Sequence, residues 1–137
     1  MTCRFSIHVD QGIACFKFTD RIAIGDARQV FVDYVAHANF DPGFAMLTDA
    51  RGVTGIDARF VGILTNVQGL SVPLRQFERG AVSVILVAGG TTFGMVRMLE
   101  QVLDFASKIT VRIARTEASA LTAAGRPDAD FARLFAF

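Results

Sequence analysis

Two aspartates are the residues of this sequence whose type and placement could do chemistry. Asp49 and Asp57 are each expected near the end of a strand, at the edge where open parallel sheets bind their ligands. Two carboxylates at such an edge could share acid–base chemistry or hold a metal ion. The competing interpretation is structural, with Asp57 capping a helix and Asp49 forming a loop ion pair with Arg51.

A glycine-rich turn, Ala88–Gly94, is the second candidate. Its four central residues, Gly89, Gly90, Thr91 and Thr92, join an apolar strand to a helical pattern. Glycines let the backbone approach a ligand closely, and the first N–H groups of a helix favour an anion. The spacing fits neither the P-loop, which needs a lysine before the Ser/Thr, nor the dinucleotide fingerprint. The alternative is a tight connection with a threonine N-cap.

The histidines and cysteines add no further site. His8, His37, Cys3 and Cys15 lack the spacing of a zinc site, and no nucleophile elbow is present. We therefore predict no catalytic residue, no metal and no cofactor. The cysteines fall in two neighbouring strands, where a disulfide is geometrically feasible. The first residues lack an apolar signal core, which predicts a cytoplasmic protein whose cysteines stay reduced as small buried hydrophobic residues.

Composition excludes several classes of protein. The 137 residues suit one domain with a sizeable core. With 14 basic and 13 acidic residues the net charge is +1, and the basic residues are scattered, so no nucleic-acid partner is expected. No apolar run approaches the roughly 20 residues that span a bilayer.

The elements that must position the two candidates begin with a hairpin. Phe5–Val9 and Ile13–Phe18 alternate as half-buried strands, and residues 19–21 break the pattern. Asp26 is expected to cap the following helix, whose apolar face runs from Ala27 to Ala38. A short strand, Phe44–Thr48, then leads into a polar loop, Asp49–Gly52.

The second half repeats strand and helix. A helix is expected over residues 60–67, followed by an irregular connection with one helical turn at most. Val82–Val87 is almost wholly apolar, which is typical of a central strand, and the next helix should turn an apolar stripe inward. The residues of that stripe are Met95, Met98, Leu99, Val102, Leu103 and Ala106. Ile109–Ile113 reads as an edge strand, Thr116 as an N-cap, and Pro127-Asp128 as the start of a last helix. The order predicts a single α/β domain with a mixed sheet of four or five strands.

Several strings resemble the STAS-like, SpoIIAA-like group, which has the anti-sigma-factor-antagonist fold. Residues 16–22 are similar to the strand that enters the first helix of that family. Residues 39–43 and 47–53 resemble its helix end, strand and acidic loop. The resemblance covers roughly residues 5–125 and rests on structural strings without a catalytic signature. It places the domain at residues 1–125, with 126–137 as a helical extension of the same domain.

The resemblance implies a mostly non-enzymatic switch or interaction module, and some related domains bind lipids or nucleotides. In the phospho-switch members a serine follows an aspartate at a helix start. If Asp57 is that aspartate, Ala58 occupies the serine position and cannot be phosphorylated. Phe131, Phe135 and Phe137 either fill the core or form an apolar patch that pairs two copies, so the expected partner is a second copy or another protein.

Overall fold

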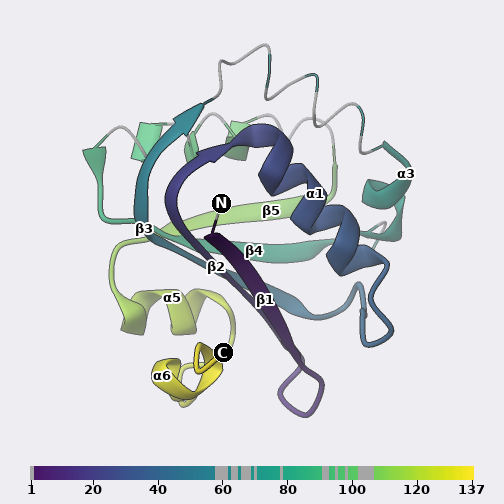
Figure 1. The fold of residues 1–137 in the computed structure, drawn as a ribbon. Helices are drawn as coiled ribbons and strands as arrows, with labels where there is room; N and C mark the ends of the chain where they lie inside the picture. The colour runs from purple at the N-terminus through teal and green to yellow at the C-terminus, as the bar shows by residue number, and fades with distance from the viewer. Residues whose placement is uncertain are drawn as a thin grey trace.

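A five-stranded mixed sheet organises the chain in the computed structural model, which describes residues 2–57, 62, 65, 69, 71–77, 79–90, 93–94, 96–97, 99–101 and 107–137 (Figure 1). The strands are β1 (Thr2–His8), β2 (Ile13–Ala23), β3 (Ala45–Asp57), β4 (Ala81–Leu86) and β5 (Ile109–Ala114). They lie in sequence order; β1 is antiparallel to β2, and all other neighbours are parallel. The predicted α/β class, hairpin and central strand are confirmed.

The long strands β2 and β3 correct two predictions. The expected break at residues 19–21 is wrong, because β2 continues to Ala23, and the expected loop Asp49–Gly52 lies inside β3. Both strands continue past the polar residues because β3 shifts register twice against β2. A Cβ at Gly52 would lie 2.9 Å from Thr19 Cγ2, so the missing side chain lets the strands approach there. Asp20, with φ 64°, takes up the second irregularity.

Helix α1 (Ile24–Val35) begins three residues earlier than predicted. Its N-cap is Ala23, so the prediction of Asp26 as N-cap is wrong. Asp26 instead occupies the third helical position, where its carboxylate accepts a hydrogen bond from the Ala23 N–H at 3.3 Å. An acid at this position satisfies a free backbone N–H of the helix start just as a capping-box glutamate does. The predicted apolar face is confirmed by buried Val30 and Tyr34.

Helices cover both faces of the sheet. One face of the sheet, called here the α1 face, packs against α1, α3 (Ser71–Leu74), the 3₁₀ turn η1 (Arg75–Phe77) and the helical residues after β4. The other face, called the α5 face, packs against α5 (Glu117–Ala123) and α6 (Phe131–Leu134). The expectation of one helical turn at most in the connection at 71–77 is wrong, because α3 and η1 follow one another as two short turns. No described helix is long and apolar enough to cross a membrane.

The helix after β4 is only partly described. Leu99 packs against the α1-face core as predicted, and Val96, which the prediction missed, is buried there too. The other stripe residues, Met95, Met98, Val102, Leu103 and Ala106, lie outside the described residues. The same holds for most of the helix expected over 60–67, of which Gly62 and Thr65 are described as helical.

The C-terminal helices follow their local signals more closely. Thr116 caps α5 as predicted, its hydroxyl accepting from the Ser119 N–H. Gly125, with φ 74°, follows the helix in the left-handed conformation. The last helix begins after Asp130 rather than at Pro127-Asp128, because the Asp130 carboxylate accepts from the Arg133 N–H and caps it there.

The two cysteines point to opposite faces of the sheet. Cys3 pairs with Phe18 and packs toward α1, whereas Cys15 pairs with Ser6 and lies in the α5-face core. A disulfide between them is therefore excluded by geometry, and both are free thiols. Burial raises the pKa of each thiol to about 12, with nearby Asp26 adding to the effect at Cys3. Neither is a thiolate nucleophile near neutral pH.

Tyr34 is fully buried in an aromatic cluster, and its hydroxyl has no hydrogen-bond partner among the described residues. The rings of Phe16 and Phe40 meet it edge-on, with centroids 5.1 and 4.9 Å away. Burial, and secondarily the negative charge of Asp41, raises the pKa of the Tyr34 hydroxyl above its usual value. The packing of the ring, not a hydrogen bond, holds this residue in the core.

Removing the hydroxyl alone should therefore not destabilise the fold. Tyr34→Phe is expected to change the free energy of unfolding by less than about 1 kcal/mol, or to raise it, because no hydrogen bond is lost. Tyr34→Ala should lower it by about 3 kcal/mol or more. Urea denaturation of the two variants measures both. A Tyr34→Phe loss as large as that of the alanine variant would mean that the hydroxyl has a partner.

The buried hydroxyl of Tyr34 predicts that the fold loses stability at alkaline pH. A raised folded-state pKa means that stability is lost as pH rises above the ordinary tyrosine pKa of about 10. Because the chain has one tyrosine and no tryptophan, tyrosinate absorbance reports this residue alone. We expect that absorbance to rise together with unfolding, and a rise in the folded protein would contradict the burial.

Candidate functional site

Asp49 is a buried carboxylate at the carboxyl end of the β3–β4 pairing, where it lies opposite Leu86. Its side chain is 9% exposed and faces the same side of the sheet as α5. Arg51, two positions further along the strand, projects from the same face. Its guanidinium donates twice, from Nε to Asp49 Oδ1 and from Nη2 to Oδ2, each at 3.0 Å. The predicted ion pair is confirmed, within a strand rather than a loop.

Arg51 also joins the sheet to the C-terminal helices. Its Nη1 lies 2.9 Å from Oε2 of Glu117, the first residue of α5, and its guanidinium carbon lies 5.3 Å from the centre of the Phe131 ring. Sequence reasoning missed Glu117, because 66 positions separate it from Arg51 and no local pattern marks it. One cation therefore holds two carboxylates and an aromatic ring.

The charge on Asp49 is fixed by this arrangement. Burial raises its pKa, but the hydrogen bonds from Arg51 and the attraction of Arg51 and Lys17 outweigh that effect and hold the pKa below its usual value. A carboxylate held ionised in a bidentate pair has no proton to donate at neutral pH. The geometry gives Asp49 a structural role.

Asp57 is the last residue of β3, whereas Asp49 lies in the first half of the strand. An extended strand advances about 3.3 Å per residue, so the backbone at Asp57 lies far along the sheet from Asp49. The side chain of Asp57 and all of Ala58 fall outside the described residues. Within the described part of the chain no three His, Cys, Asp or Glu side chains are grouped as metal ligands.

The glycine turn follows β4 as predicted. Val87 is buried, Ala88 is exposed, and Gly89 and Gly90 take φ values of 118° and 68°. Gly90 is already helical, so the turn opens directly into the next helix. Thr91 and Thr92 lie outside the described residues. Apart from chain neighbours and the backbone of the same helix, no atom of a described residue lies within 4 Å of where a Cβ of either glycine would be. The backbone conformation and not crowding therefore requires glycine here.

The positive φ at Gly89 predicts that a side chain there destabilises the fold through backbone strain. Gly89→Val should lower the free energy of unfolding by about 2 kcal/mol, because valine resists a φ near +118°. Gly25→Ala is the matched control, since Gly25 lies in the first turn of α1 with open space and no positive φ. It should be neutral or slightly stabilising. Chemical denaturation compares the two, and an equal loss in both variants would contradict the strain at Gly89.

A cation stands beside this turn. Arg115, the residue after β5, is exposed, and its guanidinium carbon lies 4.5 Å from the centre of the Phe93 ring in the first turn of the helix. It forms no ion pair within the described residues. The turn therefore has an aromatic-supported positive charge next to it, which the sequence reading did not identify.

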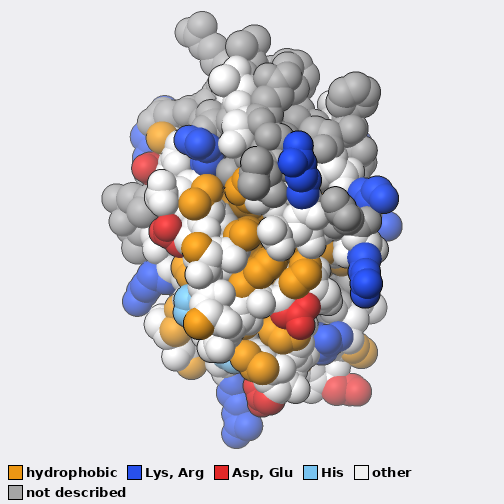
Figure 2. All heavy atoms as spheres, turned by 90° about the vertical axis from the view of Figure 1, so that its right-hand side faces the viewer, with side chains coloured by type: hydrophobic (Ala, Val, Ile, Leu, Met, Phe, Trp, Pro, Cys, Tyr) orange, Lys and Arg blue, Asp and Glu red, His pale blue; other side chains and the backbone are white. Residues whose placement is uncertain are grey.

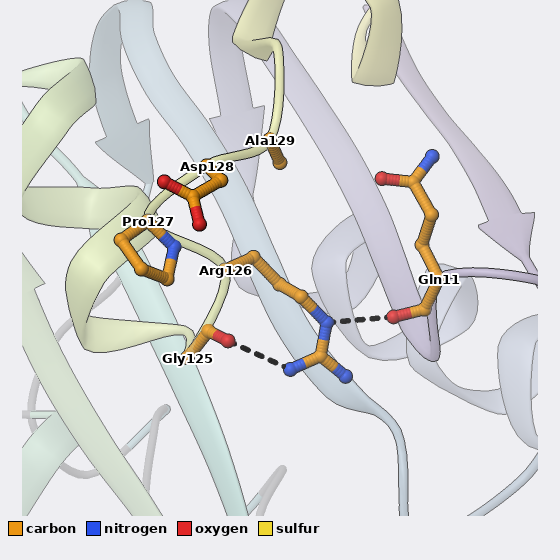
Figure 3. A pocket seen from close by; sticks show the side chains of 6 residues that line it. All are labelled: Gln11, Gly125, Arg126, Pro127, Asp128 and Ala129. Carbon is orange, nitrogen blue, oxygen red and sulfur yellow. Dashed lines mark hydrogen bonds between the residues drawn. The ribbon is translucent and has the colours of Figure 1, made fainter.

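An open hollow of about 360 Å³ lies between the loop of the β1–β2 hairpin and residues 125–129. Figure 3 shows its six lining residues, with Arg126 reaching across to the β1–β2 hairpin. The guanidinium donates to the carbonyl oxygens of Gln11 at 2.6 Å, Gly125 at 2.9 Å and Gly12 at 3.3 Å. Because the Arg126 guanidinium already donates to three carbonyls, it connects the hairpin to the C-terminal segment. The hollow is therefore a poor site for an anion.

The side of the molecule at the amino ends of the parallel strands has an apolar centre. Figure 2 shows apolar side chains gathered there, with lysines and arginines spaced around them as separate charges. A nucleic-acid surface would instead need a continuous basic stripe. This face does not present one.

Comparison with known proteins identifies the fold. No protein-family profile matches the chain, and neither does any curated protein sequence. A solved structure does: an uncharacterised protein of the DUF3478 family from Shewanella loihica PV-4, described as having a SpoIIAA-like fold. The identity is 11% and the TM-score 0.55, over 88% of this chain and 91% of that one. The chain therefore has the SpoIIAA-like fold that the sequence resemblance predicted.

Proposed function

We propose that this chain is a non-catalytic, cytoplasmic regulatory or protein-interaction module of the STAS-like type. The observation that carries the proposal is the Asp49–Arg51–Glu117 arrangement, in which the carboxylate best placed for chemistry is used to dock α5 on the sheet. The SpoIIAA-like fold supports the same conclusion, as does the protonation of both thiols.

Affinity capture from native lysate, combined with analytical sedimentation of the purified chain, tests this function. We expect a specific partner or a defined homo-oligomer. A chain that sediments as a monomer and captures nothing at any workable concentration would remove the support for an interaction module.

A second copy is one candidate partner, through Phe131, Phe135 and Phe137. The supporting feature is the stack of these rings at the C-terminus, with Phe135 centred 4.5 Å from Phe131 and 5.9 Å from Phe137. Phe131 is buried in the α5-face core, while Phe135 and Phe137 are half-buried against it. Only the outer two rings are thus free to contribute to a dimer interface.

A small-anion module is the second candidate function, with the ligand at Gly89–Thr92. It is favoured by Arg115, the exposed cation supported by Phe93 beside the turn. Inorganic phosphate, nucleotides and anionic lipid can be compared by thermal shift. A shift that is lost in Arg115→Gln and kept in the exposed-helix control Arg28→Gln supports the site. If none of these ligands changes the melting temperature, the anion-binding function is ruled out.

A further inference from the structure

The β1 strand forms an uncovered edge of the sheet. β1 pairs with β2 along its whole length without a bulge, and no described residue pairs with its other side. Natural edge strands are protected by proline, bulges, charged side chains, short length or a covering element. Within the described structure β1 has neither a proline nor a bulge, and its one exposed charge is Arg4. Its outward N–H and C=O groups are available to a further strand.

The side chains of β1 differ between the two faces. Cys3, Phe5 and Ile7 are half-buried on the α1 face, where they extend the core to the edge. Arg4 alternates with them and is exposed on the α5 face. α6 covers that face only at the far end of the strand, where its Leu134 carbonyl lies 2.9 Å from His8 Nε2. An added strand would meet an apolar row on one face and a cation on the other.

Arg4 lies directly opposite Lys17 in the β1–β2 register. Side chains so placed have Cβ atoms about 5 Å apart, and like charges there destabilise the sheet. Neither cation forms an ion pair with a described residue. On its other side Lys17 is next to Asp49, whose carboxylate Arg51 already holds. The excess positive charge therefore sits at the Arg4 end of this row.

We propose that β1 binds an extended acidic segment of a partner protein, which adds as a strand and places its carboxylates against Arg4 and Lys17. Its alternate side chains are apolar and contact Cys3, Phe5 and Ile7. This inference rests on the proposed interaction function and names the chemistry of the partner.

A second copy of the chain fits this edge poorly. Two β1 strands pairing around their central Phe5 would place Arg4 opposite Ser6 of the other copy, with the two Arg4 side chains as diagonal neighbours. Both Arg4–Lys17 pairs would then share one face without an added acid. An acidic segment relieves that repulsion, whereas self-pairing doubles it.

The probe is a synthetic peptide of about eight residues, the length of an ordinary strand, that alternates valine and glutamate. Fluorescence anisotropy should show saturable binding, and hydrogen exchange should show slower exchange at the outward β1 amides. Arg4→Glu should weaken binding by about tenfold or more. Arg112→Glu is the matched control, because Arg112 is exposed on the other edge strand, opposite Val84 of the α5-face core. It should leave binding unchanged, and Arg4→Gln should give an intermediate loss.

Several results would overturn the proposal. Equal binding of a valine–lysine peptide removes the charge argument, and equal binding of a peptide with N-methylated backbone removes strand addition. Tighter, Arg4-dependent binding of a single-stranded oligonucleotide would reassign the surface to nucleic acid. Self-association through β1 would assign it to a second copy. If a partner captured from lysate binds Arg4→Glu as well as the parent chain, this inference fails while the interaction function stands.

Discussion

Replacing Arg51 with methionine is expected to lower the free energy of unfolding by about 2–3 kcal/mol at neutral pH. The substitution keeps most of the side-chain volume but leaves the Asp49 carboxylate, 9% exposed, without its charged partner. An uncompensated buried charge costs about 3–5 kcal/mol, and the 38% exposure of the Arg51 side chain reduces the expected loss. Urea denaturation gives the value directly.

The pH dependence separates this cause from lost packing. In the parent chain the pKa of Asp49 is held low, so its stabilising effect is present above the unfolded value of about 4 and is lost on acidification. In Arg51→Met the burial remains, and the backbone N–H of residue 51 still donates to Asp49 Oδ1, but the guanidinium charge and its two hydrogen bonds are gone, which raises the Asp49 pKa. The difference between parent and variant should therefore be largest near neutral pH and shrink as the pH falls toward 4.

Two controls sharpen the test. Arg97→Met removes an exposed ion pair with Glu100 and should cost less than about 0.5 kcal/mol. The double variant Asp49→Asn with Arg51→Met should recover part of the loss, because no unpaired charge remains. A pH-independent loss in Arg51→Met, unrelieved by Asp49→Asn, would show that packing on Phe131 and not charge is the main contribution.

Replacing Phe131 with alanine is expected to lower the free energy of unfolding by about 3 kcal/mol. The ring is 9% exposed, lies in the α5-face core with Leu134, and stacks on Phe135. Its loss leaves a cavity between α6 and the sheet and removes the surface under the Arg51 guanidinium. Thermal and chemical denaturation measure the effect.

Phe137→Ala is the matched comparison, because this ring is half-buried at the end of the same stack. We expect it to cost about 1 kcal/mol or less. Sedimentation of both variants then distinguishes core from interface. A lower mass in Phe137→Ala with little loss of stability would support pairing through the outer rings, and a small stability effect in Phe131→Ala would contradict its place in the core.

The local patterns of the sequence were sufficient for most elements. Alternation identified β1 and β5, an apolar run identified β4, and the 3.6-residue period identified the buried face of α1. Thr116 marked the start of α5. Each of these signals extends over only a few consecutive residues, so a single sequence is sufficient to recognise them.

The corrections fall where a distant strand overrides a local signal. Residues 19–21 look like a break and Asp49–Gly52 like a loop because both are polar, yet each continues a strand through the β2–β3 pairing. Residues 19–21 lie opposite Gly52, Val53 and Gly55, and Asp49 lies opposite Lys17. Irregular register accommodates them, and the composition of either segment alone does not encode the partner. The prediction of Asp26 as N-cap is wrong for a related reason, since the strand runs directly into the helix at Ala23.

The candidate site divides in the same way. The sequence by itself determined the chemistry available: a carboxylate at Asp49, an arginine two residues on, a glycine turn after the central strand, and two cysteines without metal spacing. Only the tertiary structure decided their use, because Glu117 and Phe131 reach Arg51, Arg115 reaches Phe93, and Lys17 comes between Arg4 and Asp49 through contacts between distant segments. Charge and burial depend on all neighbours in space, whereas the sequence orders neighbours along the chain alone.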